Sequence, residues 1–137
     1  MDHTFQYHSH IQEIPRIRKD IELVKEKLMI PDSEIQQLQL IIEELFSNII
    51  RYAFQDEEKH LVGIGLMKRE REIDIEIIDD GIPFNPLEYD AEPSVDPAAP
   101  DAGGIGLTLI RAFSSQITYN RKSGKNYLMV TKRIKHK

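Results

Sequence analysis

Residues 61–79 read LVGIGLMKREREIDIEIID, and this stretch decides the fold. Residues 61–67 and 73–79 each predict a β-strand, and the run of charged residues between them predicts a turn. Isoleucine alternates with acidic residues in the second strand, so one face is expected to be buried and the other to contact water. Two neighbouring strands joined by so short a turn lie antiparallel.

Two amphipathic helices are predicted before this hairpin. Residues 13–28 carry apolar side chains at steps of three and four, a spacing that lines one face of a helix. Pro15 falls in the first turn, where its missing N–H costs nothing. Pro31 ends this helix, and Asp32 or the serine after it is expected to cap a second helix over residues 33–52.

The flanking segments complete a two-layer arrangement. They predict a strand over residues 4–8, a long Asp- and Pro-rich loop over 80–104, a helix over 105–113, and strands over 116–121 and 127–134. The sequence therefore predicts an α/β fold, a two-layer sandwich in which a mixed, mostly antiparallel sheet has its helices on one face. We expect one domain over residues 1–137.

Composition excludes several classes of protein. The 137 residues include 18 Lys and Arg against 23 Asp and Glu, a net charge of −5, and no cysteine. The lack of cysteine excludes disulfide scaffolds, thiolate zinc sites and cysteine nucleophiles. The longest mostly apolar window, residues 38–50, is interrupted and falls short of the roughly 20 apolar residues of a membrane span. Without a signal-peptide pattern, and with mild acidity, we expect a cytoplasmic protein that binds neither membrane nor nucleic acid directly.

The histidines carry no clear metal motif. Five are present, and none has a partner at helical metal-ligand spacing. His8 and His10 could chelate from one strand, but no third ligand lies near them. We expect a surface position or a partner contact for both.

Three segments carry polar groups in patterns that indicate chemistry. Glu44 and Asn48 lie four residues apart on a helix and point the same way. Together they could hold a water molecule and a hard cation such as Mg²⁺, which prefers oxygen ligands. The alternative is an ordinary exposed helix face.

The second segment, residues 79–84, reads DDGIPF and follows a strand. Gly81 allows a sharp turn, and Asp79 at the strand end can accept from an exocyclic amine or a backbone N–H. An ordinary Asp-Gly turn is the alternative.

The third segment, residues 103–107, reads GGIGL and opens a helix. Glycines there allow close approach of a ligand, and the N–H groups of a helix N-terminus favour phosphate. The alternative is a loop that runs into a helix cap. Neither a Walker loop nor a dinucleotide fingerprint fits.

In this order and spacing, Glu-x-x-x-Asn, Asp-x-Gly-x-Pro and Gly-Gly-x-Gly-Leu resemble the GHKL ATP-binding superfamily, which has the Bergerat fold. The whole chain, with the variant DGIPFNP over residues 80–86, resembles most the anti-sigma serine kinases of the RsbW and SpoIIAB type. The resemblance implies a Mg²⁺- and ATP-binding anti-sigma regulator with serine/threonine kinase activity. It also implies a sigma factor, a STAS-type anti-anti-sigma protein, or both as partners, and a homodimer.

The resemblance also implies roles for particular residues. Asn48 would coordinate Mg²⁺, Glu44 would be the general base, and Asp79 would accept from the adenine amino group. The other implied residues are Gly81 and Pro83 at the adenine pocket, Gly103, Gly104, Gly106 and Leu107 around the phosphates, Thr131 toward the adenine side, and Arg18 at a partner or the transferred phosphate.

One departure from the family pattern keeps a second hypothesis open. No Lys or Arg lies between Asp79 and Arg111, so the segment between the glycine-containing motifs offers the γ-phosphate only backbone N–H groups and metal. A non-catalytic switch, in which nucleotide sets the affinity for a partner, is the alternative to a kinase.

Overall fold

The computed structural model describes residues 2–54, 56, 58–88 and 104–135. Every helix and strand expected from the sequence is present, with bounds that differ by a few residues. In chain order the elements are β1 (His3–His8), the 3-10 turn η1 (Ile11–Glu13), α1 (Ile14–Val24), α2 (Asp32–Tyr52), β2 (Leu61–Lys68), β3 (Glu72–Asp79), α3 (Gly104–Phe113), β4 (Gln116–Lys122) and β5 (Lys125–Arg133).

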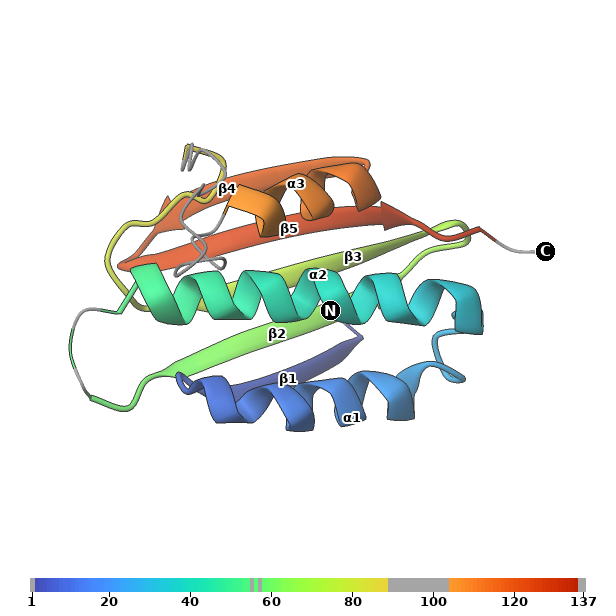
Figure 1. The fold of residues 1–137 in the computed structure, drawn as a ribbon, viewed down its shortest axis with the longest axis horizontal. Coiled ribbons are helices and arrows are strands. Elements are labelled where there is room, and N and C mark those ends of the chain that lie inside the picture. The colour runs from blue at the N-terminus through green and yellow to red at the C-terminus, as the bar shows by residue number, and fades with distance from the viewer. Residues whose placement is uncertain (1, 55, 57, 89–103, 136–137) are drawn as a thin grey trace.

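The five strands form one sheet in the order β1-β2-β3-β5-β4, and each neighbouring pair is antiparallel. The three α-helices lie on one face of this sheet (Figure 1). The predicted two-layer α/β sandwich is therefore confirmed, and the sheet is antiparallel throughout. Alternate residues of β3 are buried beneath the helices, as its isoleucine pattern predicted.

The core lies between α2 and the middle of the sheet. Leu38, Ile42 and Phe46, which share one face of α2, are fully buried, as are Ile64 and Ile75 on the sheet. Burying a side chain of this size stabilises the fold by about 1.5–3 kcal/mol. The periodic apolar stripe of α2 therefore fixes which side of the helix faces the sheet, and so where its polar residues lie.

The first helix is shorter than its apolar periodicity predicted. α1 ends at Val24, although Leu28 is buried as expected. Residues 25–29 continue as turns, and Met29 has a φ of 57°, a left-handed conformation that ends the helical path. Periodicity reports which side chains are buried, and turns can bury the same side chains as a helix.

The predicted cap of α2 is wrong. Pro31 is the N-cap and no side chain caps this end, because the helix already begins at Asp32. Asp32 instead accepts from the Nζ of Lys25 at 3.0 Å. A buried ion pair holds the first turn to the sheet, with 2.5 Å between the Nζ of Lys132 on β5 and Oε2 of Glu34.

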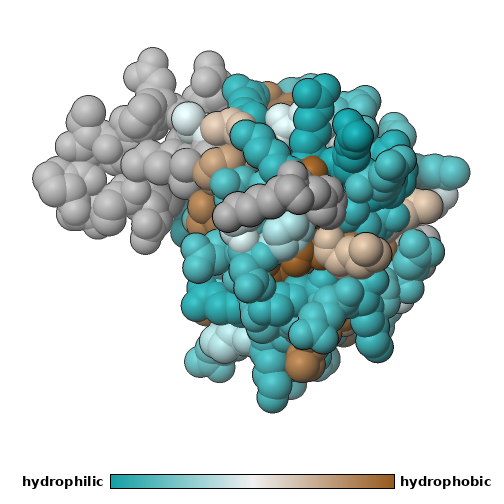
Figure 2. Space-filling model, turned by 90° about the vertical axis from the view of Figure 1, so that its right-hand side faces the viewer, coloured by the Kyte–Doolittle hydropathy of each residue, from teal (hydrophilic) through white to brown (hydrophobic). Residues whose placement is uncertain are grey.

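The end of the molecule that carries the β2–β3 turn is mostly hydrophilic, and its hydrophobic atoms show as separate small areas (Figure 2). Within the described part of the chain, no helix has the length and apolar character that crossing a membrane requires.

Candidate functional site

The Asp-Gly turn after β3 packs directly against the C-terminal end of α2. The N–H of Ile82 donates to the carbonyl oxygen of Ala53 at 2.9 Å. A Cβ added to Gly81 would lie 2.4 Å from that same oxygen, closer than any side chain can approach. Positive φ is recorded at Gly124 among the described glycines and not at Gly81, so glycine is needed here for close approach rather than for turn geometry.

Asp79 is a buried carboxylate at the end of β3. Its side chain is 3% exposed, and Oδ1 accepts from the N–H of Gly81 and from Nδ2 of Asn126, each at 2.9 Å. Burial raises the pKa of Asp79 above its ordinary value, although both hydrogen bonds act in the opposite direction. Both bonds end on Oδ1, so no donor among the described residues occupies Oδ2.

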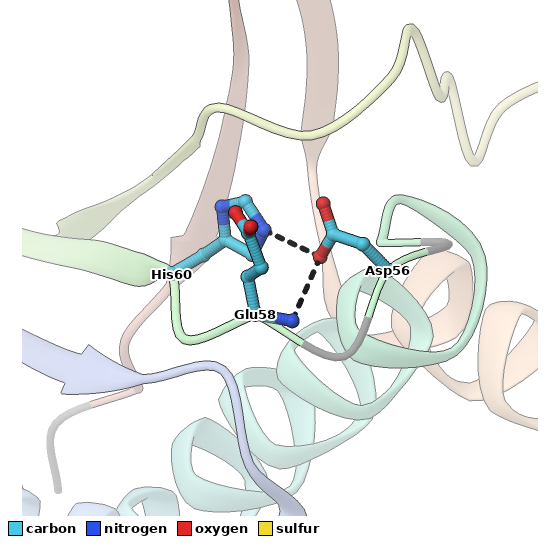
Figure 3. Close-up of side chains that lie close together, drawn as sticks. All are labelled: Asp56, Glu58 and His60. Carbon is cyan, nitrogen blue, oxygen red and sulfur yellow. Dashed lines mark hydrogen bonds and ion pairs between the residues drawn. The ribbon is translucent and has the colours of Figure 1, made fainter.

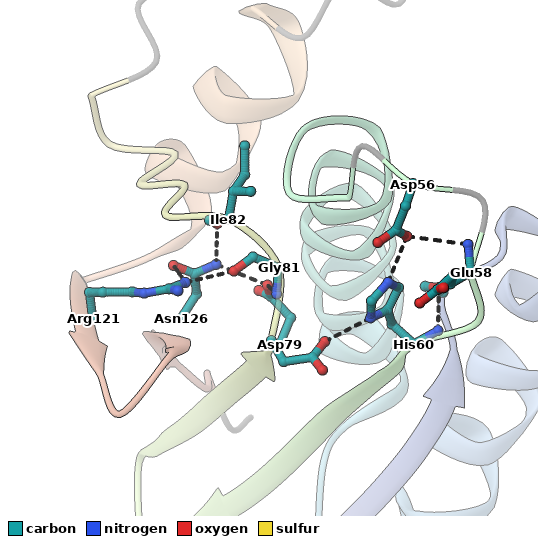
Figure 4. Close-up of polar contacts among 10 residues, drawn as sticks. Asp56, Glu58, His60, Asp79, Gly81, Ile82, Arg121 and Asn126 are labelled. Carbon is teal, nitrogen blue, oxygen red and sulfur yellow. Dashed lines mark hydrogen bonds and ion pairs between the residues drawn. The ribbon is translucent and has the colours of Figure 1, made fainter.

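Asn126 on β5 holds this turn in place. It lies opposite Asp79 in the β3–β5 register, and its Nδ2 also donates to the carbonyl oxygen of Ile82 at 2.8 Å (Figure 4). Its Oδ1 accepts from Tyr119 at 2.5 Å, from Arg121 at 3.2 Å and from the N–H of Phe84 at 3.3 Å. A single carboxamide thus connects β3, the turn, β4 and β5.

Asn126 was not predicted as a functional residue, because the last strand was expected to begin at residue 127, whereas β5 begins at Lys125. Asparagine is disfavoured in strands, so an asparagine that lies in a strand and is 3% exposed is an informative signal. That signal depends on the β3–β5 pairing, which the sequence does not reveal.

Further contacts close the turn against α2 and β4. The ring of Phe84 stacks on Tyr52 of α2 with centroids 5.4 Å apart, and Nη1 of Arg121 donates to the carbonyl oxygen of Gly81 at 2.7 Å. A cavity of about 430 Å³ opens beside the turn. Its lining residues are Ala53, Phe54, Asp56, His60, Asp80, Gly81, Ile82, Pro83 and Arg121. Gly81 and Pro83 thus line a cavity, and their assignment to adenine stays a prediction.

Glu44 and Asn48 lie on the same helix end that meets the turn. Counted from Ala53, Asn48 is five residues and Glu44 nine residues back, about 7.5 Å and about 13.5 Å along the axis. Asn48 is 7% exposed and Glu44 is half-buried. An asparagine carboxamide oxygen is the kind of ligand that a hard cation takes.

The predicted glycine-rich segment is only partly within the described residues. Gly103 lies outside them, whereas Gly104, Gly106 and Leu107 form the first turn of α3. Helix α3 runs antiparallel beside α2, so its N-terminus points toward the end of α2 that carries Asn48 (Figure 1).

Two predicted site residues, Thr131 and Arg18, do not lie near the turn that follows β3. The hydroxyl of Thr131 donates to Oδ1 of Asp74 at 2.7 Å, and it lies five residues along β5 from Asn126, about 17 Å away. Because side chains alternate along a strand, Thr131 also points to the opposite sheet face from Asn126. Arg18 lies on α1 and forms an ion pair with Glu43 of α2 at 2.5 Å.

Comparison with known proteins identifies the family of the chain. The model of the family described as the histidine kinase-like ATPase domain matches residues 8–132. Serine/threonine-protein kinase BtrW of Bordetella bronchiseptica (strain ATCC BAA-588 / NCTC 13252 / RB50) is 33% identical over 97 residues, which are 69% of this chain and 67% of BtrW.

Two solved structures share the fold. The histidine kinase domain of the Erythrobacter litoralis EL346 blue-light activated histidine kinase superposes with a TM-score of 0.57 at 14% identity, over 90% of this chain and 60% of that domain. The Acinetobacter baumannii histidine kinase AdeS gives 0.52 at 16% identity, over 96% of this chain and 68% of AdeS. The chain thus spans only three fifths of the first of these domains. From the family match over residues 8–132, and from the motifs on α2, β3 and α3, the chain belongs to the histidine kinase-like ATPase domain family.

Proposed function

We propose that this chain binds ATP with Mg²⁺ and transfers the γ-phosphoryl group to a serine or threonine of a small STAS-type protein. In the same proposal, the unengaged protein binds and silences a sigma factor as a homodimer. The family match and the printed name of BtrW support the ATP-dependent kinase class. The observation that carries the proposal is the buried carboxylate of Asp79, held beside the end of α2 that bears Asn48 and Glu44.

Asp79 fits a purine with an exocyclic amino group. Its Oδ1 is occupied by Gly81 and Asn126, which leaves Oδ2 as an acceptor for the adenine amine. Guanine presents a carbonyl oxygen at the corresponding position, so two acceptors would face each other. A buried acceptor left without a donor costs about 1–3 kcal/mol, and we therefore expect ATP to be preferred over GTP by about 5- to 150-fold.

In this proposal Asn48 binds the metal ion, and Glu44 accepts the proton that is released during transfer. The Asn48 carboxamide oxygen would hold Mg²⁺, which supplies neutralisation of the phosphate charge when bound. Glu44 would take the proton of the acceptor hydroxyl while the hydroxyl oxygen bonds to the γ-phosphorus and ADP leaves. The N–H groups at the start of α3 would face the phosphates.

The first test is calorimetry of the full chain with ATP, ADP and GTP, with and without Mg²⁺. We expect adenine-selective binding that weakens when Mg²⁺ is withheld and weakens at least tenfold in Asn48→Ala. Gln36→Ala removes an exposed carboxamide from the same helix and serves as the matched control. Folded Asn48→Ala protein that binds Mg²⁺ and ATP as tightly as the wild type would overturn the assignment of Asn48.

The second test separates chemistry from binding. Removal of a general base costs about 10²–10⁴-fold in rate, so Glu44→Gln should retain ATP binding and lose transfer by that factor. The readout is labelled phosphate from ATP on a STAS-type acceptor, with the exposed Glu26→Gln as control. Unchanged transfer by Glu44→Gln would exclude Glu44 as the base.

A non-catalytic switch is the second candidate, and one observation favours it. No Lys or Arg lies between Asp79 and Arg111, so that segment brings no cation to the γ-phosphate. In this candidate, ATP and ADP stabilise different partner-binding states, and affinity changes by their difference. ATP binding without any transfer, together with partner affinity that differs between ATP and ADP, would favour the switch over the kinase.

A further inference from the structure

Three potential metal ligands meet in the loop between α2 and β2. Asp56, Glu58 and His60 each offer one ligand atom, and these atoms all lie within 4.8 Å of one another (Figure 3). The residues alternate along the chain, so their side chains converge from one short segment. None of them is assigned above to nucleotide or Mg²⁺, although Asp56 and His60 line the same cavity as Gly81 and Pro83.

His60 is held in position on several sides. Its ring stacks on Phe54 with centroids 4.4 Å apart and an angle of 19° between the planes. Its backbone N–H donates to the hydroxyl of Ser9 at 3.1 Å, and its carbonyl oxygen accepts from the N–H of Ser9 at 2.9 Å. The side chain is only 17% exposed. The imidazole is thus fixed in both position and plane before any ion binds.

A carboxylate from a different part of the fold contacts the other side of the imidazole. Nδ1 of His60 lies 3.1 Å from Oδ1 of Asp80, which follows β3, and Nε2 lies 2.7 Å from Oδ1 of Asp56 (Figure 4). When Nδ1–H donates to Asp80, the lone pair of Nε2 faces Asp56 and Glu58. A histidine that ligates a metal almost always donates its other N–H to a carboxylate or carbonyl group in this way, which orients the ring and raises its basicity.

The local charge also favours a cation. Three carboxylates, from Asp56, Glu58 and Asp80, surround one imidazole, while Lys59 and Lys125 line the neighbouring cavity. The side chains of Asp56 and Glu58 are exposed and can rotate. Donor atoms around a tetrahedral zinc ion lie about 3.3 Å apart for bonds of about 2.0 Å, so a modest rotation of these two side chains closes the set.

We propose that Asp56, Glu58 and His60 form a binding site for a divalent transition-metal ion of the Zn²⁺ type, with Asp80 as the group that orients His60. Imidazole nitrogen combined with carboxylate oxygen suits Zn²⁺, whereas Mg²⁺ and Ca²⁺ prefer an all-oxygen set. Water completes the coordination at the exposed side. The proposal does not require the proposed function, because Zn²⁺ binding is measured in the absence of nucleotide.

The test is calorimetry of the metal-free full chain with ZnCl₂, and separately with MgCl₂. We expect one Zn²⁺ per chain, undisturbed by excess Mg²⁺. Asp56→Asn and His60→Ala should weaken binding at least 100-fold. Asp80→Asn should weaken binding about 10–100-fold, as loss of a carboxylate that orients a ligating histidine does. His3→Ala, at the opposite end of β1 from His8, is the matched histidine control.

Circular dichroism and Co²⁺ absorption distinguish loss of the metal site from loss of folding. Circular dichroism establishes that each variant is folded, and Asp56→Asn, at an exposed position, carries the test where His60→Ala does not fold. Co²⁺ in place of Zn²⁺ should give the visible absorption of a nitrogen- and oxygen-ligated ion, and that absorption should be lost in Asp56→Asn. Zn²⁺ binding that survives in Asp56→Asn and His60→Ala, or that is lost in His8→Ala instead, would overturn the site.

Discussion

At the scale of single residues, Asp79 illustrates a conflict between binding and stability. Its carboxylate is buried, and burial raises its pKa. A group whose pKa is raised in the folded state contributes stability below its unfolded pKa of about 3.9, and that contribution is lost as pH rises through the folded pKa. The ionised side chain therefore costs stability at neutral pH, and under the proposed function it is retained for the acceptor atom that it presents.

Asp79→Asn should separate these two effects. The amide oxygen can still accept from Gly81 and Asn126, so both hydrogen bonds survive while the buried charge is removed. We expect the variant to melt at or above the wild-type temperature at about pH 7, with the difference shrinking toward about pH 4. Its amide nitrogen would face the adenine amine donor to donor, so ATP affinity should fall by about 5- to 150-fold. A variant that melts well below the wild type at about pH 7 would contradict this account.

The limits of sequence-based prediction are also visible at single residues. Asp79, Gly81 and Pro83 could be selected from the sequence because they are neighbours in it, and the structure places them at one turn. Asn126 could not, because its role depends on facing Asp79 from another strand. Thr131 was placed by resemblance, and the alternation of side chains along β5 directs it to the other face of the sheet.

At the scale of elements, the ion pair between Glu34 and Lys132 connects the start of α2 to β5. Both side chains are at most 7% exposed, and the two residues lie 98 positions apart in the chain. Sequence periodicity predicted both elements but not this pair, since a lysine and a glutamate at such separation carry no joint signal. Each alone would be interpreted as a surface residue.

Removing one partner should be far more damaging than removing both. Lys132→Met leaves a buried carboxylate without its counter-charge, which costs about 3–5 kcal/mol. Exchange of both residues for apolar side chains of similar size is often neutral, so Glu34→Leu combined with Lys132→Met should recover most of the loss. Urea unfolding of the two single variants and the double variant measures both quantities. A double variant as unstable as Lys132→Met would show that the pair matters through more than its charges.

At the scale of the whole molecule, the antiparallel sheet and its layer of helices followed from local patterns, because hairpins and amphipathic helices are both short-range features. The site followed only in part, because it joins the end of α2, the turn after β3 and the β4–β5 hairpin. These parts are distant in the sequence, and their contacts depend on strand order. The order β1-β2-β3-β5-β4 is what places Asn126 next to Asp79.

The candidate nucleotide site joins the end of α2, the turn after β3 and the β4–β5 hairpin. A nucleotide bound there should therefore raise the free energy of unfolding of the whole domain. At a concentration 100 times its Kd, a ligand of the folded state adds about 2.7 kcal/mol to the unfolding free energy. For a chain of this size that corresponds to a rise in Tm of roughly 10 °C. Thermal melting with Mg²⁺ and ATP should show this rise in the wild type and in Gln36→Ala, and a much smaller one in Asn48→Ala. An equal rise in all three proteins would place the nucleotide elsewhere.

The contact between the turn and the end of α2 also makes one backbone amide a reporter of the opening of the turn. The N–H of Ile82 is bonded to the carbonyl oxygen of Ala53, so its hydrogen can exchange with solvent only when the turn leaves the helix. The exchange rate of this one amide therefore reports the fraction of molecules in which the pocket wall is open. A ligand that closes the wall would slow this exchange without touching the amide itself.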